Sequence, residues 1–104
     1  MSLNLVHVLH HSFGVPKHNI GDGIEQRCGQ QVDAREIELW LDEQSQLPDW
    51  VHRAAALWII ELWMNERDTC EAGSLLKVDE KYTRLLRDYN MGQIIAMRNA
   101  IIQA

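Results

Sequence analysis

The sequence predicts an all-α fold, a compact bundle of five or six short helices that forms a single domain over residues 1–104. Several segments place apolar residues at intervals of three and four, which is the period of a helix with one buried face. No segment alternates apolar and polar residues over any length, as a half-buried strand would. With 104 residues, 46% of them hydrophobic, the chain is long enough for one core and leaves no room for a second.

The first expected helix covers residues 3–13. Its apolar face carries Leu5, Val6, Leu9 and Phe13. Its opposite face carries polar side chains that we expect to be solvated, namely Asn4, His7 and His11. Gly14 and Pro16 end this helix, and residues 18–23 are expected to form a loop.

Two further helices are expected before Pro48. Residues 24–28 form a short helix that Gly29 ends. Asp33 is a good N-cap for a helix over residues 33–43, and Glu36 three residues later completes a capping-box pattern. The apolar side of this helix consists of Ile37, Trp40 and Leu41. Its exposed positions carry Glu36, Glu38, Asp42 and Glu43.

The second half of the chain contains three expected helices and a loop. Pro48 opens a helix whose residues 54–64 are apolar nearly all round, as in a buried central helix. Residues 65–74 are polar and are expected to form a loop. Residues 79–89 give the clearest amphipathic pattern of the chain, with an apolar side of Val78, Tyr82, Leu85, Leu86 and Tyr89. A final helix is expected over residues 93–103.

Composition favours a soluble, cytoplasmic protein. The N-terminus has no basic segment followed by an apolar one, so we expect no secretory signal. The longest apolar stretch is interrupted by Glu61 and is shorter than the roughly 20 residues that span a bilayer. Cys28 and Cys70 lie far apart without a CxxC pair, as is typical of reduced thiols inside a cell.

The sequence gives little support for catalysis. His7, His10 and His11 have the spacing that chelates a transition metal, but the solvated positions of His7 and His11 and the lack of an HExxH motif favour ordinary polar residues. Glu61 is the one charge in an apolar helix, and a structural partner such as Arg53 or Arg98 explains it better than acid–base catalysis does. Since no nucleophile or phosphate-loop motif is present, we expect no enzymatic activity, cofactor or metal.

Residues 20–48 contain a short helix that ends in glycine, a turn, and a capped helix with Ile37 followed by Trp40 three residues later. A proline then precedes the next helix. This order resembles the helix-turn-helix of phage repressor and Cro-type regulators. The resemblance implies that residues 24–29 are the first helix and residues 33–43 the recognition helix. The turn is two residues longer than the family's, through Gln30 and Gln31. Glu25 also stands where the family has a small residue.

Charge divides two functional hypotheses. Residues 1–60 contain four basic and eight acidic residues, and residues 61–104 contain six and seven. An acidic recognition helix repels phosphate. The charge therefore favours a protein that binds another protein, as a regulator, an immunity protein or a phage-type inhibitor does. Its expected contact residues are Glu36, Glu38, Asp42 and Glu43. The alternative is a helix-turn-helix transcriptional regulator. Its expected DNA contacts are Arg35, Lys77, Lys81, Arg84 and Arg87.

The last helix has apolar residues on more than one face. They are Ile94, Ile95, Met97, Ile101 and Ile102. Such a helix is either wedged into the core or leaves one face for a partner. A homodimer through the C-terminal helices is therefore one expected use of this segment.

Overall fold

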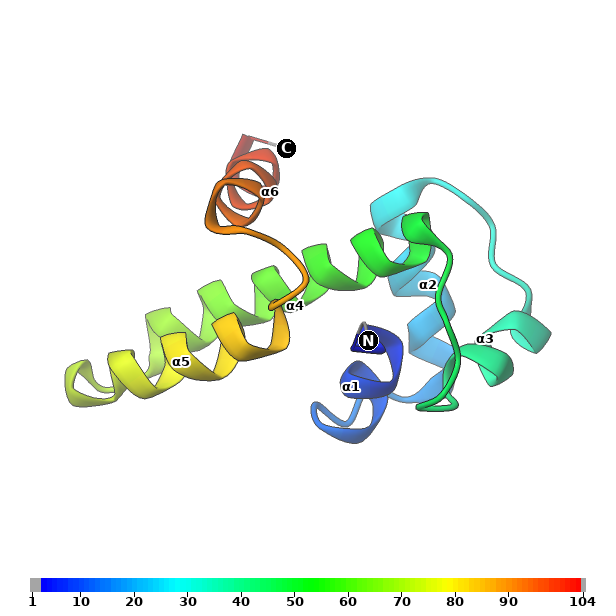
Figure 1. The fold of residues 1–104 in the computed structure, drawn as a ribbon, viewed down its shortest axis with the longest axis horizontal. Coiled ribbons are helices and arrows are strands. Elements are labelled where there is room, and N and C mark those ends of the chain that lie inside the picture. The colour runs from blue at the N-terminus through cyan, green and yellow to red at the C-terminus, as the bar shows by residue number, and fades with distance from the viewer. Residues whose placement is uncertain (1–2, 104) are drawn as a thin grey trace. The chain divides into compact units, whose positions relative to one another are not determined.

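The computed structural model of the chain describes residues 3–103, and these residues form six α-helices and no strand, which confirms the all-α prediction (Figure 1). The elements are α1 (Leu5–His11), α2 (Lys17–Cys28), α3 (Ala34–Trp40), α4 (Asp49–Thr69), the 3-10 turn η1 (Ala72–Ser74), α5 (Leu75–Leu85) and α6 (Met91–Gln103). None of the helices in this range has the length and hydrophobicity needed to cross a bilayer.

The helices group into two units. The first extends through Trp58 and contains α1, α2, α3 and the first half of α4, whereas the second begins at Ile59 and contains the rest of α4 with α5 and α6. The helix α4 runs without a break through the boundary. Its buried residues at this point are mostly small or branched, namely Ala54, Ala55, Ala56, Ile59 and Ile60.

The side chain of Asn4 is buried, although its position on the polar side of α1 predicted a solvated residue. Its Oδ1 accepts a hydrogen bond from the His7 backbone N–H (3.0 Å) and thereby caps α1. Its Nδ2 donates to the carbonyl oxygens of Trp40 (2.9 Å) and Asp42 (2.9 Å). The prediction was wrong because these partners lie 36 and 38 residues away, which no helical pattern reveals.

The loop expected over residues 18–23 is wrong, because this segment is the first half of α2. The two glycines that suggested a loop are points of close helix packing. A Cβ atom on Gly21 would lie 2.8 Å from Cδ1 of Ile37, and one on Gly23 would lie 2.2 Å from the Trp58 ring. Gly29 ends the helix in the left-handed conformation (φ 77°), as predicted.

The helix α3 starts as predicted and ends three residues early, at Trp40 rather than at residue 43. Asp33 caps it by accepting a hydrogen bond from the Arg35 backbone N–H (2.9 Å). At the other end, side chains take the backbone groups that would continue the helix. The carbonyl of Trp40 accepts from Asn4, and the N–H of Gln44 donates to Oδ1 of Asp42 (3.0 Å).

In the second unit, α4 continues five residues beyond Met64, through half of the expected loop. The chain then turns through η1, and α5 folds back along the end of α4 (Figure 1). The Trp63 and Tyr82 rings stack between the two helices, with centroids 5.7 Å apart and planes 4° from parallel. The helix α5 occupies residues 75–85 rather than 79–89, and two residues of the expected loop, Glu66 and Arg67, lie on the side of α4 that bonds α5.

Two carboxylates join α4 to α5. Glu66 accepts hydrogen bonds from Nζ of Lys81 (2.8 Å) and from the Tyr82 hydroxyl (2.5 Å). Asp79 accepts hydrogen bonds from the Arg67 guanidinium and from Nε1 of Trp63 (2.9 Å). Burial, assisted by Glu66, raises the pKa of Tyr82, so its hydroxyl stays protonated and donates throughout the neutral range. These bonds explain why residues beyond Met64 remain helical.

The same bonds predict that acid weakens the contact between α4 and α5. Lys81 and Tyr82 lower the pKa of Glu66 below 4.5, and Arg67 and Trp63 lower the pKa of Asp79 below 3.8. A carboxyl whose pKa is lowered by folding stabilises the fold above its ordinary pKa and loses that contribution as the pH falls through the lowered value.

Both ion pairs, Glu66 with Lys81 and Asp79 with Arg67, are partly exposed, so we expect a loss of at most about 1 kcal/mol for each carboxyl. The free energy of unfolding in urea is measured at about five pH values between pH 6 and pH 3. Glu66→Gln and Asp79→Asn should flatten this pH dependence. Glu71→Gln should leave it unchanged, because Glu71 is exposed and makes no ion pair within residues 3–103. Equal slopes in all variants would contradict the assignment.

The helix α6 begins at Met91, two residues before the predicted start. Asn90 Oδ1 accepts a hydrogen bond from the Gln93 backbone N–H (2.8 Å), and Gln93 Oε1 accepts one from the Asn90 backbone N–H (2.9 Å). This reciprocal pair is a capping box, so Asn90, expected as part of a stop signal, in fact starts the helix. Ile94 and Met97 are buried, as their spacing predicted.

Candidate protein-binding surface

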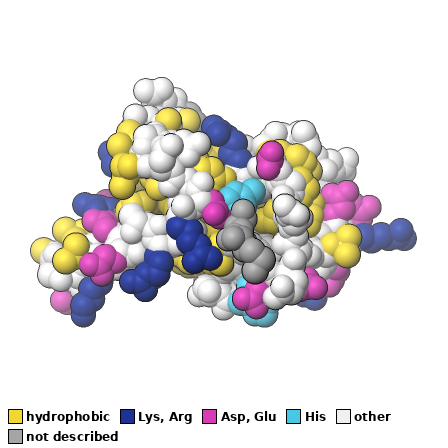
Figure 2. Space-filling view, in the orientation of Figure 1, with side chains coloured by type: hydrophobic (Ala, Val, Ile, Leu, Met, Phe, Trp, Pro, Cys, Tyr) yellow, Lys and Arg dark blue, Asp and Glu magenta, His cyan; other side chains and the backbone are white. Residues whose placement is uncertain are grey.

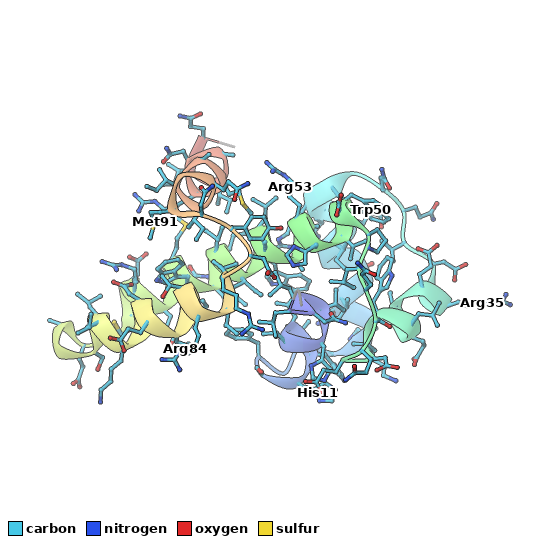
Figure 3. All side chains as sticks on the ribbon, in the orientation of Figure 1. His11, Arg35, Trp50, Arg53, Arg84 and Met91 are labelled. Atoms are coloured by element: carbon cyan, nitrogen blue, oxygen red, sulfur yellow. The ribbon has the colours of Figure 1, made fainter. Side chains whose placement is uncertain are left out.

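Four carboxylates form an exposed surface on and after α3. We call Glu36, Glu38, Asp42 and Glu43 the acidic surface, and all four are exposed as predicted. Glu36 and Glu38 project from α3, and the other two lie in the turn that follows it. Figure 2 shows acidic side chains at the end of the view where Figure 3 labels Arg35, with a basic side chain projecting beside them.

The opposite side of α3 holds this surface in place. Ile37 and Trp40 are buried, and the Ile37 side chain lies where α2 has its Gly21. The Trp40 ring meets the Trp50 ring edge-on, with centroids 5.9 Å apart. Because these contacts orient the helix, Glu36 and Glu38 point to solvent from a fixed backbone. The apolar spacing of α3 was therefore sufficient to predict which residues would be exposed.

The four carboxylates differ in their partners. Glu38 forms an ion pair with Nζ of Lys17 (3.1 Å), and both side chains are more than half exposed. Such a pair contributes little and exchanges readily with other partners. Asp42 Oδ1 accepts a hydrogen bond from the backbone N–H of Gln44. Glu36 and Glu43 make no ion pair with any residue between 3 and 103, so their charges are available to a partner.

Sequence reasoning missed Leu39, which is 67% exposed. It lies on α3 three residues after Glu36, and Glu43 follows in the turn after the helix. The signal was present in the sequence, because the buried positions of α3 are Ile37 and Trp40, which leaves Leu39 on the outer side. An exposed apolar side chain near charged ones offers a partner apolar area to bury.

The residues expected to contact DNA divide between the two units. Arg35 lies in the first and extends from α3 into solvent (Figure 3). The other four are in the second unit and are exposed, namely Lys77, Lys81, Arg84 and Arg87. Three of these four follow one side of α5 at intervals of four and three residues. Lys81 pairs with Glu66 and lies 4.8 Å from the centroid of the Tyr82 ring.

Three histidines, His7, His10 and His11, lie close together in α1. The rings of His7 and His11 have centroids 4.2 Å apart, and those of His10 and His11 are 5.0 Å apart. His10 Nδ1 lies 2.8 Å from the carbonyl oxygen of Val15. Within residues 3–103, no group of three or more histidine, cysteine or acidic side chains is arranged to hold a metal ion. Glu61 is half-buried on α4, and both cysteines are free thiols.

No family model matches this chain, and no curated protein or solved structure shows significant similarity to it.

Proposed function

We propose that this chain is a non-enzymatic binding protein, a regulator, immunity protein or phage-type inhibitor, that contacts another protein through the acidic surface and Leu39. The observation that supports the proposal is an exposed leucine between two carboxylates that have no ion-pair partner among residues 3–103. Charge on such a surface steers a basic partner into position, and the apolar side chain gains affinity when it is buried.

This division of roles predicts the chemistry of the partner. Its surface is basic and contains a small apolar pocket that receives Leu39. Because Glu38 is already paired with Lys17, the partner's cations are expected to reach Glu36 and Glu43 first. Association should be fast at low salt and slow at high salt, since exposed charges are screened beyond about 10 Å at 0.1 M.

Charge reversal tests the proposal. Glu36→Lys with Glu43→Lys should lower the association rate constant about tenfold or more at low salt and should flatten its salt dependence. Leu39→Ala should act mainly on the dissociation rate. The association and dissociation rate constants are measured by surface plasmon resonance at about 50 mM salt, where exposed charges are only weakly screened. The analytes are proteins that the wild-type chain retains.

The matched control reverses two carboxylates of the second unit, Asp68→Lys with Glu71→Lys, which changes the net charge equally. Asp68 and Glu71 are exposed and lie outside the acidic surface. A partner that loses affinity equally in both double variants responds to net charge alone and would contradict the proposed surface.

A helix-turn-helix DNA-binding regulator is the second candidate. It is favoured by the consecutive helices α2 and α3, with Gly29 between them. It is also favoured by the basic side chains along one side of α5, namely Lys77, Lys81 and Arg84. Fluorescence anisotropy with duplex DNA at about 50 mM salt tests it, because phosphate attraction is strong there. Tight, salt-sensitive binding that Arg35→Ala weakens would support this candidate over the first. No binding at tens of micromolar, roughly the range of nonspecific affinity, would exclude it.

A further inference from the structure

Three large apolar side chains are exposed along one side of α6. Met91, Ile95 and Ile102 are 57%, 49% and 57% exposed. Together with Arg98 they follow intervals of four, three and four residues, which places all four on one side of the helix. We call these four residues the outer row of α6. Figure 3 labels Met91 at the start of this helix.

The outer row is distinct from the side of α6 that packs into its own unit. That inner side carries Ile94 and Met97, which are 7% and 2% exposed. Single exposed apolar residues are ordinary on protein surfaces, whereas an aligned set on one helix indicates a contact surface. The spacing of the row is that of the contact positions in paired helices, where residues recur every 3.5 positions.

The distribution of charge indicates what covers this row. All fifteen acidic residues of the chain lie at or before Asp88, and Arg98 is the only charged residue of α6. The whole chain carries a net charge of −5, so two copies repel each other through most of their surfaces. The helix α6 itself contributes no carboxylate to this repulsion. We propose that α6 pairs antiparallel with α6 of a second copy, about a two-fold axis that passes between Ile95 and Arg98.

The position of Arg98 selects the antiparallel arrangement. In that register Met91 faces the partner's Ile102, and Ile95 faces the partner's Arg98. The aliphatic stem of Arg98 covers Ile95 while its guanidinium stays in water. A parallel pair would place the two Arg98 side chains directly opposite each other, whereas the antiparallel register offsets them by three residues, about 4.5 Å along the axis, and sets each against an apolar residue.

The size of the contact sets its strength. Thirteen residues give a helix of about 20 Å, so one helix pair buries less than the roughly 1,200 Å² of a stable, specific interface. The dimer is therefore weak and concentration-dependent. It goes beyond the proposed binding function and does not depend on it, because the acidic surface belongs to α3 in the other unit.

Cysteine cross-linking tests the pairing and its direction. In a chain with Cys28→Ser and Cys70→Ser, the variants Met91→Cys and Ile102→Cys are prepared separately and then mixed under mild oxidation. The antiparallel pair predicts a disulfide between the two different variants, at least five times (roughly a 1 kcal/mol preference) more than in either variant alone. Preferential linkage of Ile102→Cys to itself would show parallel pairing and overturn the proposal.

Sedimentation equilibrium gives an independent measurement on the otherwise unmodified chain. We expect the average mass to rise with concentration up to about 1 mM, and Ile95→Glu to abolish the rise. Ile102→Glu, near the end of the helix, provides a second variant, and circular dichroism checks that both stay folded. Leu76→Glu is the control, because Leu76 is 70% exposed on α5. A mass that never rises, or a rise that Ile95→Glu leaves intact, would overturn the dimer.

Discussion

Replacing Asn4 by alanine is expected to lower the free energy of unfolding by about 2–4 kcal/mol, although the residue belongs to no candidate binding surface. Two losses add. The first is the N-cap of α1, where Oδ1 accepts from the His7 backbone N–H. The second is the amide donor to the carbonyls of Trp40 and Asp42, of which the bond to Trp40 is buried and the bond to Asp42 is partly buried.

Asn4→Asp separates these two losses, because the new carboxyl keeps an acceptor for the cap and removes the amide donor. We expect it to be at least as destabilising as Asn4→Ala near neutral pH, since a carboxylate would face two carbonyl oxygens. The measurement is urea unfolding followed by circular dichroism. Asn99→Ala, an exposed position on α6, should stay within about 0.5 kcal/mol of wild type. If Asn4→Ala also changed the free energy of unfolding by no more than this, the hydrogen bonds of Asn4 would contribute little to stability.

The second large effect is expected at Gly23. Glycine to alanine usually stabilises a helix interior by roughly 0.5–1 kcal/mol. Here the added Cβ would lie 2.2 and 2.3 Å from Cζ3 and Cη2 of the Trp58 ring. The ring has little freedom to move away, because the Arg27 guanidinium lies over it, 4.5 Å from its centroid, and also donates to the Gly23 carbonyl (2.8 Å). Gly23→Ala should therefore destabilise the chain by about 1–3 kcal/mol.

A double-mutant cycle identifies the cause. In a Trp58→Leu background the steric conflict is relieved, so Gly23→Ala should become neutral or stabilising. Gly73→Ala is the matched control, because a Cβ there meets nothing within 4 Å. A loss of stability that persists in the Trp58→Leu background would show that the glycine is required for another reason.

The helices that sequence analysis predicted best are those whose evidence is local. Gly29 ends α2 and Asp33 starts α3 because a left-handed residue and a side-chain cap act on the adjacent backbone. The exposed acidic surface followed from the same local pattern, since burial of Ile37 and Trp40 determines which side of α3 faces water.

The errors arose where distant residues override local preference. Gly21 and Gly23 resemble a loop locally, and only Ile37 and Trp58 explain why they lie in a helix. The early end of α3 depends on Asn4, which precedes it by more than thirty residues. The exposure of Leu39 could have been predicted from the same pattern, because Ile37 and Trp40 define the buried side of α3 and leave Leu39 on the outer side.

The unbroken helix α4 has a thermodynamic consequence. Starting a helix is costly, while each further residue adds a hydrogen bond at little cost. Because one helix of 21 residues serves both units, they share a single nucleation event. Unfolding of either unit removes the packing that holds half of α4 and leaves the other half with a frayed end. Two groups of helices that each have their own contacts are thereby expected to melt as one cooperative transition.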